Sequence, residues 1–239
     1  MDNVFYIKKY LIFNSEEIPV LDFVSPLIRR RLTEIEKIGL FILNNLLPYD
    51  ENLKLIFASE YGEWQETIKL IEQTFKEKEM SPAGFSHSVH NAILGMASII
   101  YKNKCNYTTI AANKDTLDCA IIEAISSKED TLLIYAEEAT PRFYKPIFKN
   151  TFYGHGVGFI LSRNDNKENN KKNNKENNKE NSEARKICIT LNKEPLSTSI
   201  TFNNLACFLN NKSVNSLNGK YATIQSSYIK GSYIKGFAK

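Results

Sequence analysis

Long apolar runs and the features of a signal peptide are missing from this chain of 239 residues. No run reaches the roughly eighteen apolar residues that a membrane-spanning helix requires. The first residues lack the basic segment followed by an apolar core that marks a secretory signal. We therefore expect a soluble, cytoplasmic protein.

An excess of charge of one sign is also missing, because 31 basic residues face 27 acidic ones and leave a net charge of +4. This balance argues against a nucleic-acid-binding surface. Cysteines are few and far apart, and none forms a C-x-x-C pair, which favours buried or inert thiols over disulfides or a zinc site. The four are Cys105, Cys119, Cys188 and Cys207.

Apolar runs of strand length alternate with amphipathic segments of helical spacing along much of the chain. Strands are predicted at Val4–Asn14, Leu53–Ala58, Asn106–Ala112 and Thr131–Ala136. Helices are predicted at Leu27–Leu47, at Trp64–Phe75 with Trp64, Ile68, Ile71 and Phe75 on one face, after the turn Asn113–Thr116, and at Thr201–Asn210. The length suits one sizeable α/β domain or two small ones. The alternation predicts a mixed, mostly parallel sheet with helices on both faces.

The C-terminal part contains a predicted strand pair interrupted by a low-complexity segment. Gly154–Leu161 is predicted to be an edge strand that forms a hairpin with Ile187–Leu191. The segment between them consists almost wholly of Asn, Lys and Glu, which cannot form a core and predict a disordered loop. The predicted units are one domain of residues 1–163 and 184–212, an insertion at 164–183, and a C-terminal tail at 213–239 that carries a short tandem repeat.

The stretch from Met80 to Ala97 combines a chain-breaking start with polar side chains and then an apolar helix. After Ser81-Pro82 come five residues that can cap a helix or donate hydrogen bonds, namely Ser86, His87, Ser88, His90 and Asn91. From Val89 onward the apolar spacing is that of a helix buried almost all round. Ser86 or Ser88 is the expected N-cap. A sharp turn into a buried helix is how α/β enzymes present a nucleophile.

Phe85–Ala92 resembles the nucleophile-elbow segment of the β-ketoacyl synthase N-terminal domain, in the thiolase superfamily. The resemblance extends from Val4 to Leu191 and is closest to the chain-length-factor-like subunits of aryl polyene synthases. Ser25–Leu32 is similar to the family's Pro-x-x-x-Arg-Arg-Arg-Leu segment, and Thr108–Thr116 to its edge strand Ala-Ile-Ala-Ala-Gly-Glu-Asp-Thr. There Asn113 replaces a glycine, and Asn is the least costly substitute where φ is positive. The resemblance implies a thiolase-like half-fold with a C-terminal hairpin.

The resemblance further implies a subunit without a catalytic centre. Active members carry a cysteine four residues before the Val of this helix, where Phe85 stands here. They also have a second half that supplies two histidines, and this chain has only three histidines in all, His87, His90 and His155. We expect no catalytic residue, no metal and no cofactor. The expected partner is an active β-ketoacyl synthase, or a second copy of this chain, in fatty acid or polyketide synthesis.

The residues implied for this role form three groups. Phe85, Ser86, His87, His90 and Asn91 would line an acyl tunnel. The strand Thr108, Thr109, Ile110, Ala111 and Ala112 would pair with the partner. Arg29, Arg30 and Arg31 would contact an acyl carrier protein, or alternatively form a solvated basic face.

Other interpretations of the same residues remain open. Ser86 beside His87 or His90 suggests a self-contained acyltransferase or hydrolase, and a homodimeric scaffold is a third possibility. His87 and His90 share a helix face and suggest a metal site only if His155 joins them. Glu60 and Glu63 precede a helix, where carboxylates favourable to the dipole are a simpler account than catalysis.

Overall fold

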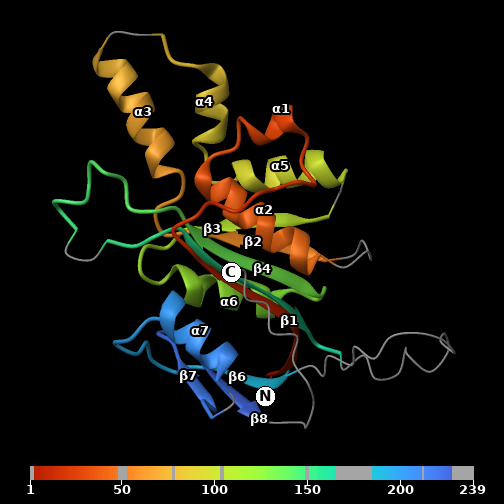
Figure 1. Ribbon diagram of the computed structural model, residues 1–239. Coiled ribbons are helices and arrows are strands. Elements are labelled where there is room, and N and C mark those ends of the chain that lie inside the picture. Colours follow the sequence, from red (N-terminus) through yellow and green to blue (C-terminus); the bar gives the residue numbers. More distant parts are fainter. Residues whose placement is uncertain are drawn as a thin grey trace, which may run out of the picture.

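The computed structural model describes residues 3–47, 53–76, 79–102, 105–148, 151–164, 185–211 and 213–227. Within these ranges, eight strands form one sheet in the order β3-β2-β4-β5-β1-β6-β8-β7 (Figure 1). The strands are β1 (Asn3–Asn14), β2 (Lys54–Ala58), β3 (Tyr107–Ile110), β4 (Thr131–Glu137), β5 (His155–Ser162), β6 (Arg185–Leu191), β7 (Ser216–Asn218) and β8 (Ala222–Ser227). Nearly all of the Asn/Lys/Glu insertion and of the C-terminal repeat lies outside the described residues.

Helices cover both faces of the sheet, as the sequence predicts, and they divide the core into two clusters. The helices are α1 (Pro26–Arg29), α2 (Glu34–Leu46), α3 (Trp64–Phe75), α4 (Pro82–His87), α5 (Ala92–Tyr101), α6 (Thr116–Ser126) and α7 (Phe202–Asn210). α2 and α5 pack on one face, and α6 and α7 pack on the other (Figure 1). In the described ranges no helix is long and apolar enough to cross a bilayer.

The sheet is mixed, but it is not mostly parallel. Only the pairs that β2 forms with β3 and β4 are parallel. The other five neighbouring pairs are antiparallel, because β5 runs back between β4 and β1, β6 runs antiparallel to both β1 and β8, and a short turn joins β7 to β8. Short connections favour antiparallel neighbours, since a parallel pair needs a long crossover.

The expected edge strand at Gly154–Leu161 is a central strand, and its expected hairpin does not form. β5 lies between β4 and β1, and every residue of it is buried, as a strand with two neighbours and two covered faces requires. β6 pairs with β1 and β8 instead of β5. β7 and β8 come from the segment that the sequence assigned to the tail, and they form the hairpin at the end of the sheet.

A bulge lets β1 contribute to both core clusters. The register against β5 shifts by one residue between Ile7 and Tyr10. Because successive side chains alternate between faces, this extra residue reverses which positions point to which side. Ile7 therefore packs with α6 and α7, whereas Leu11 and Phe13 pack with α2 and α5.

The predicted helix Leu27–Leu47 is two helices, because Thr33 begins a new one. The Thr33 side chain accepts a hydrogen bond from the Glu36 backbone N–H, and the Glu36 carboxylate accepts one from Thr33 N at 2.8 Å. This reciprocal arrangement is a capping box, whose Thr-x-x-Glu pattern is visible in the sequence. Ser25 precedes the first, short helix, α1, without a side-chain capping bond.

The apolar face predicted for α3 is only partly buried. Trp64 and Leu70 are buried, but Ile71 is 49% exposed and Phe75 is 84% exposed. α3 extends away from the sheet with α4 beside it (Figure 1), so the far end of its apolar face reaches beyond the core.

Gly156 allows α2 to approach the sheet closely. A Cβ atom at Gly156 would lie 2.8 Å from the Tyr135 carbonyl oxygen and 2.7 Å from a methyl carbon of Ile42. We expect Gly156→Ala to lower the free energy of unfolding by about 1–3 kcal/mol, measured by urea denaturation. Gly95→Ala in α5 is the matched control, because no atom lies within 4 Å of its added carbon. The control should gain about 0.5–1 kcal/mol, and equal effects at both positions would contradict this account.

Candidate functional site

Phe85 lies within a short helix and not at a strand-to-helix turn. It belongs to α4, whose N-cap is Ser81, and its side chain is 58% exposed. The expected caps Ser86 and Ser88 have other partners, since their hydroxyls donate to the Pro82 and Phe85 carbonyl oxygens at 2.9 Å. A hydroxyl bonded to its own helix is poorly placed as a nucleophile. The hydrolase interpretation of Ser86 is therefore not supported by the geometry.

The histidines of this segment have separate inward partners. His87 Nδ1 lies 2.8 Å from the Glu36 carboxylate, and His90 Nε2 lies 3.1 Å from the Ser59 carbonyl oxygen. The His90 ring also packs on Phe57, at 5.7 Å between centroids. Asn91 is the N-cap of α5, but its side chain makes no capping bond. His87 and His90 thus join the segment of α4 and α5 to α2 and β2. The described residues include no cluster of three metal-ligating side chains.

The turn between β3 and α6 has the geometry that was predicted at Phe85. The strand ends at Ile110, Asn113 adopts a left-handed conformation with φ of 53°, and α6 begins at Thr116. This confirms the positive φ anticipated at Asn113. A short strand-to-helix turn with one strained residue is the form of a nucleophile elbow.

No reactive nucleophile occupies this turn. The Thr116 hydroxyl is inside it, donating to the Asn113 carbonyl oxygen at 2.6 Å and accepting from Ala112 N at 2.9 Å. All four cysteines are free thiols. Cys119 lies one turn further along α6 and does not line the neighbouring cavity. Burial, together with Asp115 and Asp118, raises the pKa of the Cys119 thiol, which opposes formation of the thiolate.

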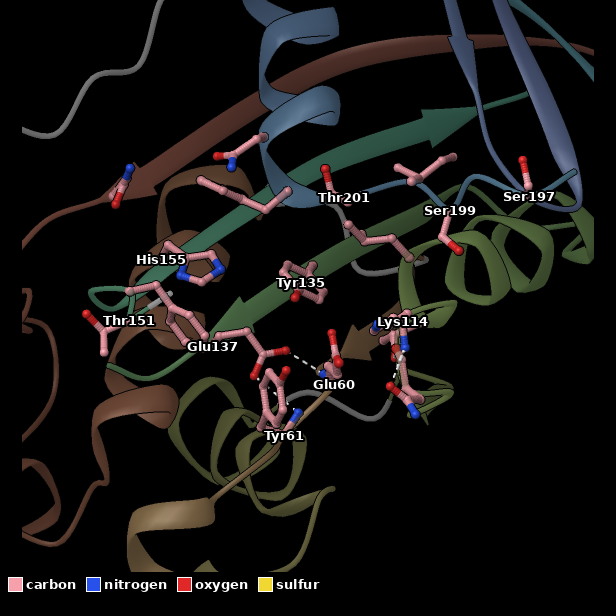
Figure 2. Close-up of a pocket in the computed structure, with 18 residues that line it drawn as sticks. Glu60, Tyr61, Lys114, Tyr135, Glu137, Thr151, His155, Ser197, Ser199 and Thr201 are labelled. Carbon is pink, nitrogen blue, oxygen red and sulfur yellow. Dashed lines mark hydrogen bonds between the residues drawn. The ribbon is translucent and has the colours of Figure 1, made fainter. Parts of the chain in front are cut away.

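A cavity of about 700 Å³ opens at this turn, beyond the carboxyl ends of β2 and β4 (Figure 2). The turn contributes Asn113 and Lys114 to its wall. Residues distant in the sequence complete the wall, among them Glu60, Glu137, His155, Ser199, Thr201 and Phe202. Ligands bind at the carboxyl ends of parallel strands in many open α/β sheets. Sequence reasoning missed this cavity, although the Glu137-Glu138 pair at a strand end was a visible signal.

Glu137 holds the loop that borders the cavity. Its carboxylate accepts hydrogen bonds from the backbone N–H of Glu60, from the Ser59 hydroxyl at 2.9 Å and from Tyr61 N at 3.3 Å. Burial raises the pKa of Glu137 to about 7, and these donors oppose the rise. Glu60 therefore lies at the cavity wall because Glu137 fixes its backbone.

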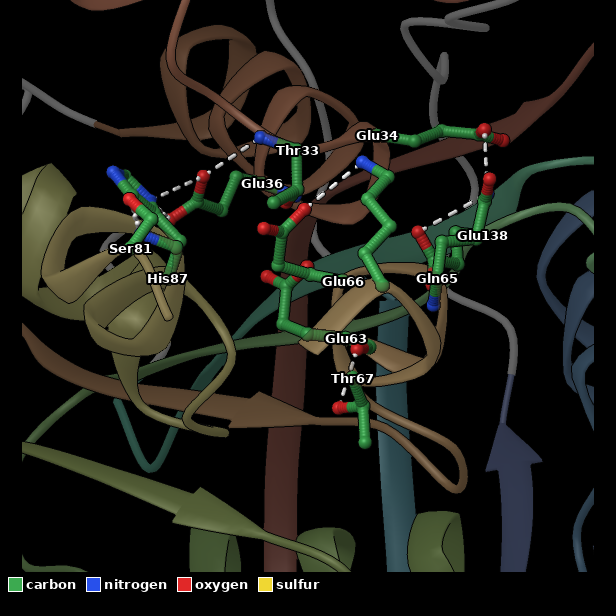
Figure 3. Close-up of polar contacts among 12 residues, drawn as sticks. Thr33, Glu34, Glu36, Glu63, Gln65, Glu66, Thr67, Ser81, His87 and Glu138 are labelled. Carbon is green, nitrogen blue, oxygen red and sulfur yellow. Dashed lines mark hydrogen bonds and ion pairs between the residues drawn. The ribbon is translucent and has the colours of Figure 1, made fainter. Parts of the chain in front are cut away.

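Two further carboxyl groups are buried where α2, α3 and the end of β4 meet (Figure 3). Glu138 accepts a hydrogen bond from Gln65 N at 2.7 Å and so caps α3 from a distant part of the chain. Burial raises its pKa to about 8. Burial and then the neighbouring Glu36 raise the pKa of Glu63 to about 9, and one carboxylate oxygen of Glu63 has no hydrogen-bond partner. Glu63 is therefore a buried structural acid, and its side chain makes no capping bond to α3.

The three arginines have different surroundings. Arg29 pairs with Asp22 at 3.0 Å and donates to the Leu21 carbonyl oxygen at 3.3 Å. Arg30 and Arg31 are exposed. The first of the three therefore braces the loop before α1, and the other two present charge to solvent.

The strand expected to pair with a partner lies at an edge of the sheet. β3 has β2 on one side and no strand on the other within the described residues. Asn106 and Ile110 accept hydrogen bonds from β2, so Tyr107 and Thr109, which alternate with them, turn their backbone N–H and C=O groups outward. Such an edge is a template for another strand.

A family model described as the β-ketoacyl synthase N-terminal domain matches residues 8–222. This match spans most of the chain, so the protein belongs to the β-ketoacyl synthase N-terminal-domain family, and the predicted resemblance is confirmed. Among curated proteins, no match was found.

Two solved structures share the fold. One chain comes from the structure of the ketosynthase ApeO in complex with its chain length factor ApeC from Xenorhabdus doucetiae, with a TM-score of 0.69 and 16% identity over 94% of this chain and 99% of that chain. The other is a β-ketoacyl synthase from Burkholderia phymatum STM815, with a TM-score of 0.50 and 8% identity over 87% of this chain and 69% of that chain. At these identities the likeness establishes the thiolase-like fold alone.

Proposed function

We propose that this chain is a non-catalytic, chain-length-factor-like subunit that pairs with an active β-ketoacyl synthase. The turn between β3 and α6 carries this proposal, because it keeps the form of an elbow but presents Asn113 and Lys114 in place of a thiol. Condensation by this family's route requires a thiolate, an oxyanion site and imidazoles at the malonyl carboxylate. Among the described residues, His155 is the only histidine that lines the cavity.

The open edge of the sheet at β3 supports pairing with a synthase. The structure of the ketosynthase ApeO with its chain length factor ApeC contains a chain that this protein matches over nearly its whole length. A partner strand added along the outer edge of β3 would extend the sheet through backbone hydrogen bonds. The segment from α4 to α5 carries three exposed apolar side chains, which would add contact area with the partner. They are Phe85, Val89 and Ile99.

Phe85 is the residue proposed to limit the length of the product. Its ring is exposed on α4, so it is free to reach into an acyl tunnel formed with the partner. His87 and His90 bond inward and would hold α4 and α5 in position. Ser86 and Asn91 are the other polar residues of this segment proposed to line the tunnel. The substrates would be the acyl chains of fatty acid or polyketide synthesis, such as an aryl polyene. Arg30 and Arg31 are the exposed cations available to an acyl carrier protein.

Co-expression with an active β-ketoacyl synthase tests this function. We expect a one-to-one complex on sizing, and products that become longer by one or more extension units when Phe85→Ala removes the ring. Phe143→Ala is the matched control, because Phe143 is 65% exposed on the loop after β4. Condensation by the isolated chain would overturn the proposal. So would a homodimer that excludes the synthase.

A further inference from the structure

The cavity at the β3–α6 turn has two ends of different chemistry. His155, Glu137 and Thr151 lie at one end in Figure 2, and Lys114, Ser197 and Ser199 lie at the other. Tyr135 lies between them. The volume of about 700 Å³ is in the range of sites that enclose small organic molecules. The pairing along β3 that we propose above does not involve this cavity.

Aromatic rings surround His155 at its end of the cavity. The ring centroids of Phe202, Phe152 and Tyr135 lie 4.6, 5.0 and 6.2 Å from that of His155. All three of these residues also line the cavity. Such walls favour a planar apolar group, since ring–ring contacts add about 0.5–1.5 kcal/mol to the burial of area.

The imidazole of His155 offers a hydrogen-bond acceptor within these walls. Its Nδ1 lies 2.8 Å from the Tyr153 carbonyl oxygen, which can only accept, so Nδ1 carries the proton. Burial lowers the pKa of His155 and favours the neutral ring. Nε2 is then a lone-pair acceptor, and it has no hydrogen-bond partner among the described residues.

The carboxyl groups beside His155 are acceptors as well, whereas the Thr151 hydroxyl can both donate and accept. Glu137 presents a carboxyl group at the same end, and Glu60 presents a second one beside it (Figure 2). The Tyr135 hydroxyl is a poor donor to a ligand, because it already interacts with Glu137. A ligand that seats here must therefore bring its own hydrogen-bond donor.

We infer that the cavity binds a small aromatic molecule whose ring carries a hydrogen-bond donor, such as a phenol. The ring would lie among Phe152, Phe202 and Tyr135, and its hydroxyl would donate to His155 Nε2. The hydroxyl-lined end with Lys114 leaves room for a polar substituent on the far side of the ring. This site is on the chain itself and does not depend on the proposed partner.

Binding of p-cresol and of toluene to the isolated full-length chain tests this inference. The two molecules differ only by the hydroxyl group. Trp64 is the only tryptophan and stacks on Tyr61 and Phe152, both of which line the cavity, so its fluorescence reports occupancy. We expect saturable binding of p-cresol that is about tenfold tighter than that of toluene, as one satisfied hydrogen bond predicts. Absence of saturable binding, or equal affinity for both, overturns the site.

Substitutions separate the contribution of the hydrogen bond to His155 from that of the aromatic wall. His155→Leu should weaken p-cresol about tenfold and leave toluene unchanged, whereas Phe202→Ala should weaken both. Phe143→Ala, outside the cavity, should change neither. Thermal unfolding shows whether each variant is folded. If His155→Leu binds p-cresol as tightly as the unchanged chain, His155 does not accept the hydrogen bond from the phenol. The co-expression experiment does not depend on this result, so a failure of ligand binding leaves the proposed pairing with a synthase untouched.

Discussion

Thr109→Pro should weaken the complex with a β-ketoacyl synthase at least about tenfold while leaving the isolated subunit folded. Thr109 turns its backbone N–H away from β2, so proline at this position removes an outward donor and not a bond of the sheet. The proline ring would also occupy the space of the incoming strand. We expect the affinity for the synthase to fall at least about tenfold, since a lost hydrogen bond and a steric clash add. Sizing and calorimetric titration of the co-expressed pair measure this.

Thr109→Val is the matched control for this prediction. Valine keeps the backbone donor and the β-branched shape, so the complex should survive. Thr108→Pro should instead destabilise the subunit itself, because Thr108 faces β2 in the sheet. If Thr109→Pro pairs with the synthase as well as the unchanged chain does, the partner does not bind along β3.

Glu63→Gln should stabilise the protein strongly at alkaline pH. Burial raises the pKa of Glu63 from 4.5 to about 9, so the folded chain holds a proton that the unfolded chain has released. The contribution of Glu63 to the free energy of unfolding is therefore greatest below about pH 4.5 and is lost as the pH rises toward 9. Each such proton changes the free energy of unfolding by about 1.4 kcal/mol per pH unit. Glutamine cannot ionise and removes this dependence.

Denaturant unfolding at several pH values between 5 and 9 measures the effect. The variant should lose a slope of up to about 1.4 kcal/mol per pH unit and gain roughly a few kcal/mol over the unchanged chain near pH 9. Glu137 and Glu138 retain their own raised pKa values, so part of the alkaline loss remains. Glu72→Gln, at an exposed ion pair with Lys76, is the control and should change little. Parallel pH profiles for Glu63→Gln and the unchanged chain would show that Glu63 is ionised in the fold.

The candidate site could be predicted from the sequence only in part. The strand expected at Asn106–Ala112 followed from a local apolar pattern, and its edge position and the positive φ at Asn113 followed from the resemblance to the family. The elbow was placed at Phe85 because a polar cluster before an apolar helix is also the pattern of two packed helices, which α4 and α5 are. The structure contains that turn after β3 instead, where Asn113 was the signal.

The sequence by itself determined most of the strands and helices, since apolar residues recur at strand or helix spacing along each of them, and the continuous apolar run of β4 is buried throughout. The break before α2 and the strands β7 and β8 were not predicted. The tertiary structure alone decided the strand order, because an apolar run looks the same whether its neighbour is β4, β1 or β6. It also decided that Glu63, Glu137 and Glu138 are buried and that His155 packs against Phe202 in the cavity wall. These contacts join residues far apart in the chain, and local spacing carries no information about them.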